Sequence, residues 1–277
     1  MTSTIASNSP PTVTNSRRSV IRNILAGRHG TLVRVVSVVL TLLAWEAYGR
    51  QVDAVFMSYP TAILAAVPQM IMSGELPRAL LSSLQSLVIG LAFAILLGTL
   101  LGLLMGRYRL IDQLLDVQIN ALYATPNVAL VPLVILWFGL GIGAKIFIVF
   151  LAAFFPIIVN TYAGVRNVGR ALVEIALAEG ASEPQVFSKV VVPAALPFIT
   201  TGVRLAMGRA VVGMVVAELF TAVSGLGGAI VVYGNAFATD KLFVIIILLA
   251  LIGLALTESV RLLEKWLAPW KETERAS

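Results

Sequence analysis

The sequence contains no cysteine, and its single histidine, His29, lies in a basic N-terminal segment. Disulfide frameworks and zinc sites of the cysteine and histidine types therefore lack their ligands. A histidine-based nucleophilic triad is disfavoured as well, because His29 lies outside every apolar segment of the chain. We expect this chain to hold no metal and no cofactor, and to have no enzymatic activity of its own.

Charged residues are scarce too, at 12% of the 277 residues, whereas apolar residues reach 58% and the mean hydropathy is +0.94. Soluble domains are about half apolar and about a quarter charged. The basic residues behind the net charge of +6 cluster beside apolar runs and form no stripe with interleaved aromatics, which disfavours a nucleic-acid partner. The composition is typical of a chain surrounded by membrane lipid.

Six apolar runs approach the length of about 20 residues that a helix needs to cross a bilayer. They are Thr31–Tyr48, Leu84–Gly106, Ala121–Leu140, Ile146–Val165, Phe198–Phe220 and Leu242–Leu262. The third run is the weakest because Pro126 and Pro132 interrupt it. We predict an all-α polytopic membrane protein with six transmembrane helices over residues 31–265, a disordered cytosolic arm over 1–30 and a cytosolic tail over 266–277.

Basic residues are distributed unevenly around these runs. With the N-terminus inside, fourteen of them belong to cytosolic segments and the span ends beside them: Arg17, Arg18, Arg22, Arg28, Arg34, Arg107, Arg109, Arg166, Arg170, Lys189, Arg261, Lys265, Lys271 and Arg275. Only four, Arg50, Arg78, Lys145 and Lys241, fall on the opposite side. Because cytosolic loops are enriched in Lys and Arg, both termini are predicted to be cytosolic.

Within the second run, Gly98, Gly102 and Gly106 recur every four residues. Small residues at this spacing lie on one helix face and let another helix backbone approach closely. The spacing therefore predicts tight packing of this helix against a neighbour.

The segment between the fourth and fifth runs, residues 166–197, is too polar for lipid and is predicted to be a cytosolic loop. Its local pattern favours a helix over Ala171–Ala178, a left-handed glycine at Gly180, and a second helix that begins with a capping box of Ser182 and Gln185. We expect this second helix to run to about Val192 and to stop at Pro193. Two short helices joined at a glycine elbow can dock into a groove on a partner, or can be an ordinary interhelical loop.

The same loop carries the first family resemblance. Glu174-Ile175-Ala176, Gly180 six residues after the glutamate, and Val190-Val191-Val192-Pro193 together resemble the EAA motif of ABC importer permeases, with conservative departures at Ile175, Val190 and Val192. In that family the loop forms coupling helices that dock into a cleft of a cytosolic ATPase. The resemblance assigns this ATPase-coupling role to Glu174, Ala176, Gly180, Ala181, Ser182 and Pro193.

Further stretches narrow the resemblance to the nitrate, sulfonate and taurine branch of these permeases. They are Ser58-Tyr59-Pro60-Thr61, Leu133–Ile135 leading into Trp137–Gly141, Ala217-Glu218-Leu219, Ser224–Gly227, and Leu263-Glu264 with Pro269-Trp270. The branch implies import of a small oxyanion such as nitrate, an aliphatic sulfonate or taurine, although permeases for thiamine precursors and other small organic solutes look similar. A secondary transporter or channel is the rival class, but it would not need the glycine elbow.

The resemblance also implies partners and a location. It implies a homodimer of this subunit, a cytosolic ABC ATPase dimer that binds ATP and Mg, and a periplasmic or lipoprotein solute-binding protein, all at a bacterial inner membrane. Residues Gly139–Lys145 look superficially like a phosphate loop, but the chain has no GK[ST] sequence, so the ATPase is expected to be a separate chain.

Three residues are candidates for the solute path. Arg209 lies inside the fifth run, where a charge faces either a water-filled path or an intramembrane partner such as Glu258. Glu218, at the end of that run, is expected to shape the outer gate region. Pro126 kinks the third run, either to open a cavity or passively. Arg204, nearer the cytosolic end, is expected to snorkel to the membrane surface.

Overall fold

A computed structural model describes residues 28–221 and 224–267 of the chain. Within these ranges every regular element is helical, so the predicted all-α fold class is confirmed. The predicted N-terminal arm (1–30) lies outside the described residues except for its last three positions, which begin the first helix. The predicted tail (266–277) lies outside them from residue 268 onward.

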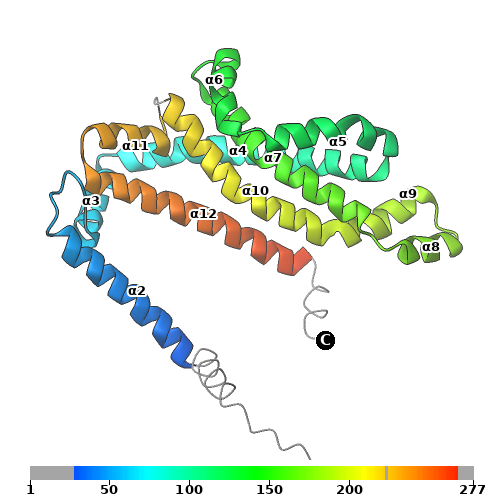
Figure 1. Cartoon of the computed structure of the whole chain (residues 1–277), viewed down its shortest axis with the longest axis horizontal. Coiled ribbons are helices and arrows are strands. Elements are labelled where there is room, and N and C mark those ends of the chain that lie inside the picture. The colour runs from blue at the N-terminus through cyan, green and yellow to red at the C-terminus, as the bar shows by residue number, and fades with distance from the viewer. Residues whose placement is uncertain (1–27, 222–223, 268–277) are drawn as a thin grey trace, which may run out of the picture. The chain divides into compact units, whose positions relative to one another are not determined.

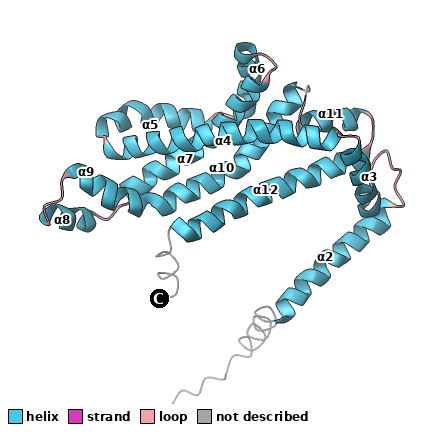
Figure 2. Cartoon of the chain, turned by 180° about the vertical axis from the view of Figure 1, so that it is seen from behind, coloured by secondary structure: helices cyan, strands magenta, loops and turns pink. Residues whose placement is uncertain are grey.

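The helices follow one another with short connections (Figures 1 and 2). In chain order they are α2 (Arg28–Gly49), α3 (Pro60–Met72), α4 (Glu75–Arg107), α5 (Arg109–Ala124), α6 (Asn127–Phe138), α7 (Ile142–Arg166), α8 (Arg170–Ala178), α9 (Glu183–Val186), η1 (Phe187–Val191), α10 (Val192–Thr221), α11 (Leu226–Asn235) and α12 (Thr239–Leu267). Five continuous helical segments are long and apolar enough to span a membrane, and α5 with α6 pass the same test together. The described part of the chain thus supplies the six predicted spans if this pair counts as one.

The third predicted span, Ala121–Leu140, is not one helix, and its predicted start is wrong. Its first four residues end α5, which begins at Arg109, and the rest contains α6; the two helices meet at an angle of 101° and diverge visibly in Figure 1. Thr125 is extended, with ψ of 131°, because the ring of the following Pro126 disfavours helical geometry at the residue before it. Pro132, in contrast, is accommodated inside α6. Pro126 is therefore the break that the sequence indicated.

The predicted helix end at Pro193 is wrong. From Glu183 to Thr221 the chain is one continuous helical rod of 39 residues, formed by α9, η1 and α10. The π-helical turn η1 precedes the proline, and the Val192 N–H donates to the carbonyl of Phe187, five residues back. This widened turn shifts the carbonyls that the proline ring would meet, so the helix continues past it.

The chain divides into two compact units, residues 1–62 and 63–277, which are described separately. In the first unit, the carboxylate of Glu46 at the end of α2 accepts hydrogen bonds from the Thr61 hydroxyl at 2.7 Å and the Thr61 backbone N–H at 3.0 Å. The Trp45 indole donates to the Ser58 carbonyl at 3.0 Å. The Ser58–Thr61 stretch thus fastens the turn that follows the first span.

In the second unit, α7 is the central helix and packs along both α4 and α10. The core between them contains Leu87, Leu91, Ala94, Val149, Ala153, Ile157, Ala206, Ala210 and Met214. A Cβ atom added at Gly102 or Gly106 would lie only 2.6 Å from the Thr161 Cβ or 2.5 Å from the Val165 Cβ of α7. The predicted close approach at the glycine stripe is confirmed, and it makes α4 and α7 a tightly packed pair.

Candidate functional site

The segment Arg170–Val191, called the elbow below, contains α8, the turn at Gly180, α9 and η1. Gly180 has φ of +84°, as predicted. Its N–H donates to the Leu177 carbonyl at 3.0 Å, and the N–H of Ala181 donates to the Ala176 carbonyl at 3.0 Å. These two bonds form a Schellman motif, which ends α8 and satisfies its last carbonyls.

The second half of the turn is closed by the predicted capping box. The Ser182 backbone N–H donates to the Gln185 side chain at 2.8 Å, and Pro184 lies in the first turn, where its missing N–H costs nothing. Ala176, Gly180, Ala181 and Ser182 therefore build the elbow together. Of the remaining predicted coupling residues, Glu174 is an exposed side chain on α8, within the elbow, and Pro193 follows η1, just outside it.

No residue of α8 is buried within the chain. Its large apolar side chains are strongly exposed, with 53% for Leu172, 62% for Ile175 and 46% for Leu177. A helix of 9 residues is too short to be stable by itself in water. This apolar surface is suited to contact with a partner.

The elbow is attached to the rest of the unit through η1. Val186 is buried, and Phe187 and Val191 pack against a cluster that contains Val165, Ala195 and Ile199. The Arg107 guanidinium at the end of α4 lies 4.5 Å from the centre of the Phe187 ring. This is within the range of a cation–π interaction.

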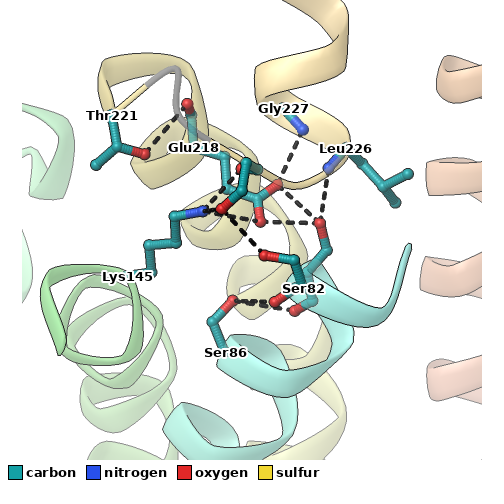
Figure 3. Close-up of polar contacts among 9 residues, drawn as sticks. Ser82, Ser86, Lys145, Glu218, Thr221, Leu226 and Gly227 are labelled. Atoms are coloured by element: carbon teal, nitrogen blue, oxygen red, sulfur yellow. Dashed lines mark hydrogen bonds and ion pairs between the residues drawn. The ribbon is translucent and has the colours of Figure 1, made fainter. Parts of the chain in front are cut away.

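At the other end of α10 lies a buried polar cluster, shown in Figure 3 and called the Glu218 network below. The Glu218 side chain is fully buried. The Ser83 hydroxyl of α4 lies 2.8 Å from both carboxylate oxygens, and the Gly227 backbone N–H donates to one of them at 2.9 Å. Lys145 Nζ of α7 lies 3.8 Å from the carboxylate.

The network extends into the turn before α11. Lys145 donates to the Ser224 carbonyl at 2.7 Å and lies 2.8 Å from its hydroxyl, and Ser83 accepts a hydrogen bond from the Leu226 N–H at 2.8 Å. Ser82 contacts the Ser224 hydroxyl at 3.2 Å. Buried charges are tolerated when they are paired and hydrogen-bonded, as these are. The network therefore fastens α10 and α11 to α4 and α7.

Gly225 is required by this arrangement. It has φ of +95°, and an added Cβ would overlap the Glu218 carboxylate. A Cβ at Gly227 would lie 2.6 Å from the Glu218 Cβ. The Ser224–Gly227 motif thus consists of residues that bind the glutamate or leave room for it.

Arg209 lies on the wall of a separate pocket of about 270 Å³ between α6, α7 and α10. The lining is otherwise almost entirely apolar: Asn127, Val128, Val131, Ile148, Ala152, Gly208, Val212, Gly213 and Val216. The guanidinium lies 5.0 Å from the centre of the Tyr123 ring. In the described part of the chain, no carboxylate is within ion-pair distance of Arg209.

The alternative pairing of Arg209 with Glu258 is not found, because Glu258 instead lies 3.3 Å from Arg261. The other intramembrane arginine, Arg204, forms an ion pair with Glu264 of α12. The predicted path residues do not form one site. Arg209 lines the pocket, Pro126 adjoins it through its neighbour Asn127, and Glu218 belongs to the network.

The sequence analysis does not identify Ser83 and Lys145 as members of the Glu218 network. It treats Lys145 only as a charge beside a span and as the last residue of a stretch that resembles a phosphate loop, and nothing near Ser83 in the sequence marks it. Beyond the network, the Tyr233 hydroxyl of α11 donates to Glu75 at 2.8 Å, and burial together with this carboxylate raises the pKa of Tyr233 to about 12. This contact joins α11 to the start of α4.

The long apolar helices and the broken third span define a helical membrane protein. The family model described as "Binding-protein-dependent transport system inner membrane component" matches residues 94–271, and the chain belongs to that family. It is thus a permease subunit of an ABC importer.

Curated relatives cover nearly the whole chain. The "Putative aliphatic sulfonates transport permease protein SsuC" of Bacillus subtilis is 35% identical and aligns over 89% of this chain and 90% of its own length. The "Taurine transport system permease protein TauC" of Escherichia coli is 33% identical over 92% and 95%. The "Formylaminopyrimidine transport permease protein ThiX" of Halalkalibacterium halodurans is 32% identical over 85% and 94%.

Among solved structures, an inward-facing form of the MetNI methionine ABC transporter matches with a TM-score of 0.51 and 21% identity. The match covers 65% of this chain and 92% of the other. At this identity the likeness concerns the fold, and it supports the permease fold expected from the sequence.

Proposed function

We propose that this permease forms the membrane path for a small oxyanion, such as nitrate, an aliphatic sulfonate or taurine. Relatives described as sulfonate and taurine permeases support this solute class. The relative described as a formylaminopyrimidine permease favours a thiamine precursor as the alternative. The first class presents an anionic nitrate or sulfonate group, so the charge of the residues that line the pocket bears on the choice between them.

The observation that carries the proposal is the unpaired guanidinium of Arg209 in an apolar pocket. A guanidinium matches the planar array of oxygens of nitrate or a sulfonate and can donate two hydrogen bonds to it. The Asn127 side-chain oxygen, on the same wall, is buried without a hydrogen-bond partner. Because this oxygen only accepts hydrogen bonds, it suits a donor such as the ammonium group of taurine, while Arg209 offers donors to the anionic group and has no competing carboxylate among the described residues.

The elbow is the proposed docking site for the ATPase. Its exposed apolar face on α8 suits insertion into a groove of a partner. The chain has no GK[ST] sequence of its own, so ATP and Mg are assigned to that separate ATPase dimer. Since a dimeric ATPase offers two clefts and each chain has one elbow, we infer a homodimer of this permease.

The orientation follows from the same assignment. With the elbow in the cytosol, both termini are cytosolic, the basic residues concentrate on that side, and the Glu218 network faces the periplasm. The subunit is placed in the bacterial inner membrane. A periplasmic or lipoprotein binding protein delivers the solute on the network side, and ATP-driven movement of the elbows exposes the path alternately to the two sides.

Arg209→Gln tests the proposed solute path, because it keeps a polar side chain but removes the charge. The complete importer is assembled in vesicles, and the uptake of labelled nitrate, methanesulfonate and taurine is measured with complex yield and ATP hydrolysis. We expect uptake to fall about tenfold or more while yield and hydrolysis persist, as expected for the loss of a charge-assisted contact.

Arg204→Gln is the matched control, because Arg204 is already paired with Glu264. Its loss is expected to lower complex yield and uptake together. Full uptake by Arg209→Gln contradicts the path, and transport of none of the three solutes contradicts the solute class.

A further inference from the structure

The contact between Arg107 and Phe187 joins the elbow to a helix that is not its covalent neighbour. Arg107 is the last residue of α4, and Phe187 is the first residue of η1. Both side chains are half-buried. Within the described residues no carboxylate lies within ion-pair distance of Arg107, and its guanidinium faces the rings of Phe187 at 4.5 Å and of Tyr108 at 5.3 Å.

The polypeptide chain itself leads from the elbow into the membrane through the least regularly hydrogen-bonded part of the helical rod Glu183–Thr221. The π-helical turn at Phe187–Val191 lacks the regular ladder of hydrogen bonds, and Pro193 follows it without an N–H to donate. Such segments are where helices bend. A displacement of α9 is therefore absorbed in part before it reaches α10.

The contact of Phe187 with Arg107 offers a second connection, through α4, which is stiffer than the π-helical turn. α4 is one uninterrupted helix of 33 residues, and its glycines hold it tightly against α7. From Arg107 to Ser83 it spans about 36 Å, at 1.5 Å per residue. Ser83 is the residue that binds both the Glu218 carboxylate and the Leu226 N–H. A single helix thus connects the elbow to the Glu218 network.

We infer that Arg107 is a positioning residue that transmits the movement of the elbow to α4 through the Phe187 ring. This role rests on the proposed docking of an ATPase at the elbow. In this arrangement the elbow and the far end of α4 move together, although the helix between the elbow and α10 is compliant. Loss of the contact uncouples ATP hydrolysis from movement at the network without preventing ATPase binding.

The test uses the absence of cysteine from the chain. Ala79→Cys places a single thiol near the network end of α4, beside Ser224 and Gly225. The permease is purified with its ATPase, and labelling of this thiol by an impermeant maleimide is measured with and without a non-hydrolysable ATP analogue. In the otherwise unchanged chain the labelling rate is expected to depend on the analogue.

Arg107→Gln and Phe187→Leu are each expected to reduce this nucleotide dependence about threefold to tenfold, the range of a partly buried cation–π contact, with unchanged ATPase co-purification. The double variant is expected to be no worse than either single one, since both remove the same contact. Phe187→Tyr, which retains a ring, keeps the response. Arg109→Gln is the matched control and is expected to leave the response unchanged, because Arg109 is an exposed basic neighbour for which the described residues show no cation–π contact with either ring.

Any of three labelling results overturns the inference: a nucleotide-independent rate in the otherwise unchanged chain, a normal response in Arg107→Gln, or additive losses in the double variant. Loss of ATPase co-purification only in the Arg107 and Phe187 variants also overturns it, because the contact would then merely shape the elbow. Failure of the unsubstituted chain to bind the ATPase is a different result. It contradicts the proposed function itself, and the inference falls with it.

Discussion

At the Glu218 network the polar side chains are buried and paired, whereas on α8 of the elbow the large apolar side chains are exposed. The two regions lie at opposite ends of the same helical rod, Glu183–Thr221. Lys145 and Glu218 are at most 3% exposed, and Ile175 is 62% exposed. The first end is complete within the chain, and the second has the surface of a subunit that lacks its partner. This difference is what we expect if the Glu218 network is a fixed joint and the elbow is the proposed docking surface.

The Glu218 network and the elbow are expected to face opposite sides of the membrane, and a topology in which they do not would have the largest effect on this comparison. Reporter fusions after Ser224 and after Ser277 are expected to report opposite sides of the membrane, periplasmic and cytosolic respectively. The reason is that the predicted six-span topology assigns fourteen basic residues to one side and four to the other. Two fusions that report the same side contradict the six-span topology and remove the basis for placing the elbow in the cytosol.

Lys145→Met is expected to cause the largest loss of stability, because it leaves Glu218 buried without its cationic partner. Removing one member of a buried ion pair costs about 3–5 kcal/mol. Unfolding of the purified permease in increasing SDS measures the change. Lys241→Met is the control, since Lys241 is only half-buried and contacts the Tyr233 ring at 5.5 Å. Equal stability of the two variants would show that the network does not hold α10 and α11.

Gly180 in the elbow and Gly225 in the Glu218 network both have positive φ, so substitutions at these two positions compare the free space at the two ends. Gly225→Ala adds a Cβ that overlaps the Glu218 carboxylate, whereas a Cβ at Gly180 meets no atom within 4 Å. Gly180→Ala is expected to cost only the left-handed backbone strain of about 1 kcal/mol, and Gly225→Ala about 2–4 kcal/mol because overpacking is added. The same SDS titration measures both. A Gly180→Ala loss as large as that of Gly225→Ala contradicts the open surroundings of the elbow.

The elbow was predictable because its chemistry is local. The left-handed Gly180 and the capping box of Ser182 and Gln185 depend only on residues a few positions apart in the sequence. Both predictions were confirmed. The wrong prediction was the helix end at Pro193, since a proline pattern does not reveal that a π-helical turn precedes it and relieves its clash.

The network was not predictable for the opposite reason. Its members are separated by 135 positions between Ser83 and Glu218. Hydrophobic runs identify helices but not which faces meet, so an isolated Ser or Lys carries no signal. The ion pair of Arg204 with Glu264 and the pocket at Arg209 were likewise produced by packing between distant helices. Pro126 was an exception, because a proline acts on its own backbone.

Site-specific cross-linking from the elbow tests the central claim most directly. Ile175→Cys provides a single exposed thiol on α8 in a chain without other cysteines. In cells that express the whole importer, we expect this thiol to cross-link to an ATPase chain, and we expect Gly180→Val to weaken the cross-link by distorting the turn. A cysteine at Ala79, at the opposite end, is expected to give no such product. Absence of an ATPase cross-link from Ile175→Cys in the assembled importer contradicts the assignment of the elbow.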